Sequence, residues 1–466
     1  MNTQQPLVSV YITNYNYARY IRTSIESVLN QTLQDFELLI IDDGSTDDSK
    51  DIIETYRDRP GISIIYQHNK GLNVTNNIAM RASHGKYIMR LDADDFLEPQ
   101  ALEVMSNVLE SDPALGLVFP NYYYVDGNGE ITGEERRHDF EKEVSLYDQP
   151  AHGACTMVRL AFLRDLGGYN ESFTCQDGYD LWIKFILHHK VTNVKQPLFS
   201  YRRHGQNLTT NELRILTTRK QIKDLHIDTY QLRLPETVAI IPVRNAFIGT
   251  VNWPLFEYEG KTILEATIEK ASLSNRVQWV VVTSADENIL ELANAIADRY
   301  PKLQVIPRPE AFARVNEPLT KTFEHVLDQL ATQDVRPEAI MQVSVEFPFM
   351  TKDVIDDAVN TLTIFQGDSL LSVRPDNRMY YQHIGHGMVP ILDQEKFTKL
   401  EREALYKGAG GVVIATVKSF REHGTMVAGK VGHIVVDQKT AFFVQSEFDL
   451  YLVNKILDPA VLEQTR

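Results

Sequence analysis

Residues 87–96 read YIMRLDADDF, an apolar run that leads directly into three aspartates, Asp92, Asp94 and Asp95. The run predicts a buried strand. Carboxylates crowded at a strand end repel one another unless a cation or hydrogen-bond donors offset their charge. Because Mg²⁺ and Mn²⁺ prefer oxygen ligands and bind through one or two carboxylates plus a substrate diphosphate, the stretch indicates a metal-bound nucleotide. Aspartate is also common in turns and at helix N-termini, which is the alternative role for this triplet.

The segments that precede this stretch alternate short apolar runs with helical patterns. Strand-like runs occupy residues 7–13, 36–43 and 62–68, and amphipathic helical patterns lie between them. Strands separated by helices of this length predict a parallel sheet with right-handed crossovers. The first half of the chain is therefore predicted to be an α/β domain.

A second strand-led series begins after a polar helical stretch. Residues 205–235 carry no strand pattern and end at Pro235, and TVAIIPVRN, residues 237–245, then starts a new alternation of strands and helices. The fold class predicted for the chain is thus α/β, with two Rossmann-like nucleotide-binding domains. We expect the first domain to span residues 1–232, including a helical linker at its C-terminal end, and the second to span residues 236–466.

The composition of this chain of 466 residues is typical of a globular protein, with 43% hydrophobic and 24% charged residues. A formal net charge of -16 disfavours nucleic acid as a partner, because binding depends on Lys and Arg that neutralise phosphates. The sequence contains no apolar run long enough to predict a transmembrane segment, and its start lacks a signal-peptide pattern. The two cysteines, Cys155 and Cys175, fit reduced thiols, so we expect a cytoplasmic protein.

Polar residues follow three of the predicted strands at the points where they end. In α/β sheets these carboxyl ends form the edge at which ligands bind, so the side chains are expected to converge there. They are Thr13, Asn14, Tyr15, Asp42, Asp43, Asp92, Asp94 and Asp95.

Five segments, in this order along the chain, resemble the family 2 glycosyltransferases of the GT-A fold: PLVSVYITNYN, SIESVLNQT, FELLIIDDGSTDDS, GKYIMRLDADD and QDGYDLW. The resemblance covers roughly residues 6–205. It implies that Thr13, Tyr15 and Asp43 hold the base and ribose of a nucleotide sugar, the base usually being uracil. It also implies that Asp92 and Asp94 bind the metal and the diphosphate, with Asp94 as the preferred direct ligand.

Glycosyl transfer also needs a general base that accepts the proton of the acceptor hydroxyl. The family has a Glu-Asp pair ahead of an apolar helix, and the matching segment here is QDGYDLW. Alignment on Gln176-Asp177 selects Asp177, whereas alignment on Asp-Leu-Trp leaves Gly178 at the base position. We prefer Asp177 and keep Asp180 as the second candidate. Capping of the helix N-terminus is the alternative role for either aspartate.

Other segments of the first half also match the family or depart from it. GGYNESF, residues 167–173, resembles the acceptor-side loop, and His204 or Arg202 is expected either to contact the diphosphate or to have a structural role. Asp95 is expected to support the metal ligands or to cap a helix that opens near Pro99. The Arg-Asn pair common in the family reads Asn76-Asn77 here, which removes one familiar nucleotide contact.

The second half resembles the cytidylyltransferases that activate sialic acid and related keto sugars, over roughly residues 236–457. Its first loop keeps Arg244 but lacks the glycine pair and the lysine that would cradle a triphosphate. Phe443 and Gln445 stand where the family has metal-binding aspartates, which leaves Asp449 as the nearest acid. We therefore prefer a noncatalytic role for this domain, in dimerisation or in ligand binding, over an active nucleotidyltransferase.

The histidines of YYQHIGHGM, His383 and His386, lack an obvious third metal ligand. The related cytidylyltransferases dimerise through an insertion in this region, so the resemblance implies a loop or a subunit contact here. A homodimer that forms through the C-terminal domain is the expectation.

Together these features predict a cytoplasmic, Mg²⁺- or Mn²⁺-dependent inverting glycosyltransferase. The resemblance implies a nucleoside-diphosphate donor, a UDP-sugar, and a glycan, lipid-linked or protein acceptor in bacterial surface glycan or glycoprotein assembly. One alternative is a bifunctional enzyme whose C-terminal domain makes a CMP-sugar from CTP. Another is a carbohydrate-binding scaffold without activity, against which the retained acidic residues weigh.

Overall fold

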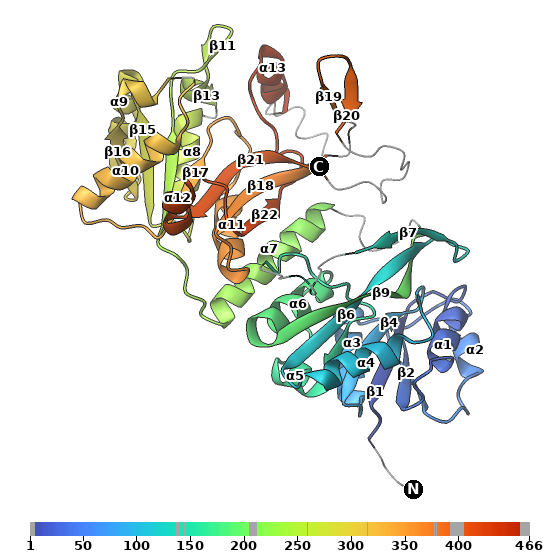
Figure 1. Cartoon of the computed structure of the whole chain (residues 1–466). Helices are drawn as coiled ribbons and strands as arrows, with labels where there is room; N and C mark the ends of the chain where they lie inside the picture. The colour runs from blue at the N-terminus through green and yellow to red at the C-terminus, as the bar shows by residue number, and fades with distance from the viewer. Residues whose placement is uncertain are drawn as a thin grey trace. The chain divides into compact units, whose positions relative to one another are not determined.

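The computed structural model describes residues 5–136, 140, 142, 146–204, 212–258, 260–314, 316–376, 378, 380–391 and 405–456. It divides into two compact units, one of Met1–Ile222 with His383–Glu403 and one of Lys223–Gln382 with Ala404–Arg466 (Figure 1). The division falls inside α7 (Glu212–Thr229). Within the described ranges, every helix is too short or too polar to cross a membrane.

The first unit is built on a mixed sheet with the strand order β3-β2-β1-β4-β8-β6-β9-β5, and β7 pairs with β6. β1 to β4 are parallel, β8 is antiparallel to β4 and β6, and β6 is parallel to β9. The strands are β1 (Val8–Asn14), β2 (Phe36–Asp42), β3 (Ile62–Tyr66), β4 (Tyr87–Asp92), β5 (Phe96–Leu97), β6 (Leu115–Val125), β7 (Ile131–Glu135), β8 (Met157–Arg159) and β9 (Lys190–Arg202). The helices are α1 (Ile21–Leu29), α2 (Ser49–Glu54), α3 (Leu72–Ala82), α4 (Ala101–Ser111), α5 (Leu160–Asp165) and α6 (Asp177–His188).

The alternation of side chains along β1 and β4 separates an apolar face from a polar one. Val8, Val10 and Ile12 pack into one core cluster with residues of α1, α2 and α4. Because successive side chains point to opposite faces, Tyr11 of β1 lies on the other face. Its register partner on β4 is Arg90, so this buried face of the central strands carries a phenol beside a guanidinium.

The second unit holds another mixed sheet, with the order β16-β15-β10-β17-β21-β18-β22. The strands of this sheet are β10 (Thr237–Pro242), β15 (Trp279–Ser284), β16 (Leu303–Pro307), β17 (Ala339–Val343), β18 (Ser369–Asp376), β21 (Leu405–Thr416) and β22 (Val431–Val435), and the short pairs of this unit are β11 (Phe247–Ile248) with β12 (Val251–Asn252) and β13 (Glu257–Tyr258) with β14 (Lys261–Thr262). A further short pair is β19 (Tyr381–His383) with β20 (Met388–Pro390), and its residues from His383 onward are grouped with the first unit. The α-helices are α8 (Ile263–Ser272), α9 (Glu287–Ile296), α10 (Thr320–Thr332), α11 (Lys352–Ile364), α12 (Val417–His423) and α13 (Glu447–Ile456), and single 3₁₀ turns occupy Trp253–Leu255, Ala297–Arg299 and Glu310–Phe312.

Both units share one arrangement of the first four strands of their large sheets, which are β1 to β4 in the first unit and β10, β15, β16 and β17 in the second. In each, the first strand lies between the second and the fourth, the third lies outside the second, and all four are parallel. The prediction of an α/β fold is confirmed. The sheets are mixed rather than purely parallel, because each fourth strand pairs on its far side with an antiparallel strand, β8 in the first unit and β21 in the second.

Candidate active site

The carboxylate of Asp92 lies at the end of β4, beside the end of β1. The Thr13 hydroxyl donates a hydrogen bond of 3.1 Å to Asp92 Oδ1, and Arg90 Nε lies 3.0 Å from the same oxygen. Burial raises the pKa of Asp92, the charge of Arg90 opposes this shift, and the charges of Asp94 and Asp177 add to it. Asp94 and Asp177 are therefore close enough to influence the Asp92 carboxylate.

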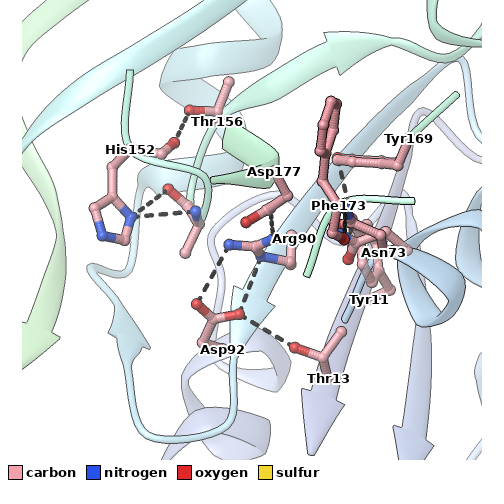
Figure 2. A network of polar contacts seen from close by, with 12 residues as sticks. Tyr11, Thr13, Asn73, Arg90, Asp92, His152, Thr156, Tyr169, Phe173 and Asp177 are labelled. Carbon is pink, nitrogen blue, oxygen red and sulfur yellow. Dashed lines mark hydrogen bonds and ion pairs between the residues drawn. The ribbon is translucent and has the colours of Figure 1, made fainter. Parts of the chain in front are cut away.

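Arg90 connects the first of these carboxylates to Asp177. Its guanidinium lies between the two acids and is 5% exposed (Figure 2). Nη1 of Arg90 donates to Asp177 Oδ2, and the Nε side faces Asp92. Sequence reasoning did not select Arg90, although a charged residue inside the apolar run YIMRL was a usable signal, since lone charges are rarely buried without a partner.

Two glycines allow the backbone to pack closely around the Arg90–Asp177 ion pair. A Cβ atom at Gly153 would lie 2.6 Å from Arg90 Nη2 and 3.3 Å from Asp177 Oδ2. A Cβ atom at Gly178 would lie 3.0 Å from the Cα of Gly153. The segment that leads into β8 thus approaches the first turn of α6 with no space for side chains, which explains why glycine follows Asp177.

The two candidates for the general base have different surroundings. Asp177 is the first residue of α6 and pairs with Arg90, whereas Asp180 is 1% exposed and lies 2.8 Å from Lys184 Nζ. The residue at the N-cap of α6 is Gln176, and its side chain makes no capping bond. Asp180 is therefore engaged with a neighbour on its own helix, and Asp177 is the candidate that faces the strand ends.

Asp94 and Asp95 are held by the end of β9. His204 Nε2 lies 2.9 Å from Asp94 Oδ2, and Arg202 Nε donates to the Asp94 carbonyl at 2.8 Å. The backbone N–H of Arg202 donates to Asp95 Oδ1 at 2.8 Å. Asp95 does not cap a helix as one of our alternatives had it, because α4 begins only at Ala101. Burial and the charges of Asp94 and Asp92 raise the pKa of Asp95 well above its ordinary value.

The residues expected to hold the nucleoside lie on the loops after β1 and β2. Asp43 is 6% exposed, and its oxygens accept hydrogen bonds from Gln67 Nε2 at 2.7 Å and from the backbone N–H groups of Lys70 and Gly71 at 2.8 and 2.9 Å. It thereby fixes the loop that leads into α3. Tyr15 leaves 46% of its surface exposed.

The donor set at the end of β4 is chemically compatible with Mg²⁺ or Mn²⁺. It offers the carboxylates of Asp92 and Asp94, and the imidazole of His204 contacts Asp94. Asp95 Oδ2 is buried, and the part of the chain that is described provides no hydrogen-bond partner for it. Among the residues that the structure describes, no group of three or more aspartate, glutamate, histidine or cysteine side chains is placed to bind a metal ion. A cation held here would thus take further ligands from a diphosphate and water, as Mg²⁺ usually does.

The predicted positions of the second unit have mainly local contacts. Asp449 Oδ2 accepts hydrogen bonds from Ser446 N at 2.9 Å and Gln445 N at 3.2 Å, at the start of α13. Phe443 packs its ring against Phe347 at 5.1 Å between centroids, and Arg244 is exposed. His383 and His386 lie in the segment that is grouped with the first unit. His383 Nδ1 accepts a hydrogen bond from the N–H of Gly385, and His386 is exposed on the β19–β20 hairpin. Among the residues described, neither histidine joins a metal-binding cluster.

Comparisons with known proteins concern the first unit. The model of "Glycosyl transferase family 2" matches residues 9–166. Chondroitin synthase of Escherichia coli is 33% identical over 211 residues, which are 45% of this chain but 31% of that protein, so the chain spans about a third of its length. S. aureus TarS in complex with UDP-GlcNAc aligns with a TM-score of 0.41 and 18% identity, over 47% of this chain and 65% of that one.

A shorter relative is matched over most of its own length. An uncharacterized glycosyltransferase of Methanocaldococcus jannaschii is 33% identical over 207 residues, which make up 42% of this chain and 71% of that protein. The chain therefore belongs to glycosyl transferase family 2.

Proposed function

We propose that the first unit is a metal-dependent, inverting glycosyltransferase that moves a sugar from a UDP-sugar to a hydroxyl group. The observation that carries the proposal is the buried Asp177 carboxylate, which is separated from Asp92 only by the Arg90 guanidinium. This arrangement lies at the carboxyl ends of parallel strands, where α/β sheets bind their ligands. A candidate base thus stands beside candidate diphosphate-binding carboxylates.

The reaction is a single displacement at the anomeric carbon. The acceptor oxygen bonds to that carbon, the bond from the carbon to the diphosphate breaks, and Asp177 takes the acceptor proton. Mg²⁺ or Mn²⁺ held by Asp94 and Asp92 would stabilise the negative charge of the departing diphosphate. Thr13 and His204 orient these two carboxylates through the contacts described above. Inversion is inferred from the family resemblance.

The nucleoside is assigned to the loops after β1 and β2, with Thr13, Tyr15 and Asp43 holding the base and ribose. The exposed ring of Tyr15 supports this assignment, because an aromatic face in solvent is available for stacking on a base. Asp43 also keeps the neighbouring loop in place through three hydrogen bonds. The assignment places His204 at the diphosphate, through its contact with Asp94.

The proposed acceptor is a glycan, with lipid-linked and protein acceptors as the other classes. The name of the related E. coli protein, chondroitin synthase, favours a sugar hydroxyl. The corresponding process is bacterial surface glycan or glycoprotein assembly. The cytoplasm is the proposed location, since nucleotide-sugar donors are made there.

For the second unit we keep a noncatalytic, cytidylyltransferase-like role, with domain bounds of 1–232 and 236–466. Its shared order of four parallel strands supports a nucleotide-binding ancestry. The hydrogen bonds of Asp449 to neighbouring residues and the ring contact of Phe443 with Phe347 weigh against a metal centre. The β19–β20 hairpin, whose residues from His383 onward are grouped with the first unit, has exposed apolar side chains, which support homodimer formation. They are Tyr381, Ile384, Met388 and Ile391.

The proposal is tested by thermal unfolding of the full chain with UDP-, GDP- and CMP-sugars, with and without Mn²⁺. A ligand at 100 times its Kd stabilises the native state by about 2.7 kcal/mol, so binding is visible as a higher Tm. We expect a UDP-sugar to raise the Tm, and we expect the increase to be larger when Mn²⁺ is present. UDP should also be released slowly in the same mixture.

Variants separate the two candidate centres. Asp94→Asn and Asp177→Asn are expected to abolish UDP release, and Asp58→Asn, on an exposed surface position, is the matched control. Consumption of CTP with formation of a CMP-sugar, unaffected by Asp94→Asn, supports the bifunctional alternative instead. Failure of every UDP compound to shift the Tm contradicts the donor assignment.

A further inference from the structure

The loop Gly168–Phe173, which we call the acceptor-side loop, is attached to α3 through its backbone. Asn73 Nδ2 donates hydrogen bonds of 2.8 Å to the carbonyls of both Asn170 and Phe173. Asn77 Nδ2 donates at 2.8 Å to the carbonyl of Tyr169, and Asn77 Oδ1 accepts from the Tyr169 N–H at 2.9 Å. The two asparagines thus hold peptide groups at three positions of the loop.

The asparagines form one face of α3. Residues three and four apart in a helix are surface neighbours, so Asn73, Asn76 and Asn77 lie together. They are 6%, 0% and 5% exposed, although asparagine is normally a surface residue. An amide is suited to this position because it offers two N–H donors and an acceptor oxygen, which match the peptide groups of an irregular segment.

A second anchor fixes the beginning of the loop. Lys184 Nζ donates to the carbonyl of Gly168 at 2.8 Å and pairs with Asp180 at the same distance. A Cβ atom at Gly168 would lie 2.6 Å from Asn77 Oδ1, so the loop approaches α3 as closely as glycine allows. Asp180, our second candidate for the base, therefore contributes to holding the loop.

The anchored loop lies next to the candidate base. The Tyr169 hydroxyl is 3.3 Å from the Tyr11 hydroxyl (Figure 2). Tyr11 also donates a hydrogen bond of 3.2 Å to Asn76 Oδ1. The charges of Arg90 and Asp177 both act on the Tyr169 phenol, whose pKa burial raises to about 12. The buried side of the loop is therefore part of the surroundings of Asp177.

The opposite side of the loop faces solvent. Glu171 and Ser172 are exposed, and Asn77 Nδ2 donates to Glu171 Oε1 at 2.8 Å. The same amide that fixes the backbone thus also directs this carboxylate. A carboxylate with a fixed direction can accept hydrogen bonds from the hydroxyl groups of a sugar.

Resting on the proposed glycosyltransferase function, we propose that Asn73 and Asn77 are positioning residues for the acceptor. They keep the acceptor-side loop as a preformed wall of the acceptor subsite, and Glu171 on that wall hydrogen-bonds a sugar hydroxyl. The acceptor class is therefore a saccharide rather than a simple alcohol. The Asn76-Asn77 pair, which departs from the family pattern of nucleotide binding, serves the acceptor instead.

The first test uses transfer kinetics of the full chain. The probes are a UDP-sugar with Mn²⁺ and a panel of p-nitrophenyl glycosides, and the readout is UDP release above hydrolysis by water. We expect Asn77→Ala, Asn73→Ala and Glu171→Ala to raise the acceptor KM about tenfold or more, which is 1.4 kcal/mol in binding. The donor KM and the rate of hydrolysis should change by less than about twofold, because water does not need the acceptor-side loop in order to react.

Asn121→Ala is the matched control. The Asn121 side chain is 5% exposed and donates to the carbonyl of Lys195 at 2.6 Å, so this variant also removes a buried amide that holds a backbone. It should lose stability without a change in acceptor KM. Equal losses of hydrolysis and transfer in Asn77→Ala and Asn121→Ala would mean a merely structural role and overturn the proposal.

Hydrogen exchange gives a readout that needs no turnover. Asn77→Ala should speed amide exchange in residues 168–173 at least tenfold while β4 keeps its protection, and Glu171→Ala should leave this exchange unchanged. Unchanged exchange in Asn77→Ala refutes the positioning role. Absence of any UDP-sugar hydrolysis counts against the proposed function but leaves the exchange result interpretable, and a panel in which only nonsugar alcohols stimulate UDP release refutes the saccharide assignment.

Discussion

Replacement of Arg90 by methionine tests the central feature of the candidate active site. Methionine fills a similar volume but has no charge, so Asp92 and Asp177 lose the cation that lies between them. Removal of one partner from a buried ion pair costs about 3–5 kcal/mol, because the remaining charge is left uncompensated. We expect the upper part of this range, since two carboxylates lose their partner and the exposed fractions of their side chains are only 25% and 12%.

The assay is chemical and thermal unfolding of the full chain. For a unit of this size, a loss of about 3–5 kcal/mol lowers the Tm by about 6–20 °C. Asp177→Asn in the Arg90→Met background should recover part of the loss, because it removes one of the uncompensated charges. The double-mutant cycle should therefore give a coupling energy of at least about 1 kcal/mol.

Two results would refute this reasoning. A loss below about 1 kcal/mol in Arg90→Met would mean that the ion pair has the energy of a solvent-exposed one. Additive effects of Arg90→Met and Asp177→Asn would mean that the two side chains do not interact in solution. Arg159, whose Nε donates to the Leu115 carbonyl at 2.6 Å without a carboxylate partner in that contact, supplies the control Arg159→Met.

Three further outcomes are expected. Gly153→Ala should destabilise the protein and slow UDP release, because its Cβ would lie 2.6 Å from Arg90 Nη2; activity equal to that of the parent contradicts this packing. Asp94→Asn should remove the Mn²⁺-dependent part of the Tm shift caused by a UDP-sugar, and an unchanged shift shows that Asp94 is not a metal ligand. Burial and the charge of His188 lower the pKa of His189, which stacks on Phe162 with centroids 4.0 Å apart. The unfolded state then binds the proton more strongly, so stability falls as the pH drops below about 6.5 through the folded pKa. His189→Gln should weaken that loss, and NMR titration of the imidazole checks the direction.

The hydrophobic pattern allowed the main elements to be predicted because the underlying physics is local. The apolar run before Asp92 is a buried strand, and the apolar helix after Gln176 begins at Asp177. The same periodicity indicated both α/β units. It did not reveal the antiparallel strands β8 and β21, because the pairing direction of a short strand depends on neighbours far along the chain.

The candidate site was only partly predictable for a similar reason. The motif residues Asp92, Asp94 and Asp177 were selected from the sequence, and the structure brings them close together. The role of Asp95 could not be judged from sequence spacing, because its partner, the Arg202 backbone, became apparent only once the strands had packed. The partner of Asp180 is different, since Lys184 lies four residues further along the same helix and that spacing alone predicts the contact.

The sequence by itself determined that two α/β units alternate strands with helices and that one strand ends in clustered carboxylates. Periodicity and residue type suffice for this, since each acts over a few neighbouring residues. Only the tertiary structure decided that Arg90 pairs with Asp177, 87 positions away, and that Asn73 holds Phe173, 100 positions away. The physical reason is that a buried charge or amide must find a complementary group within about 3 Å, and the packing of the sheet and its helices selects which group that is.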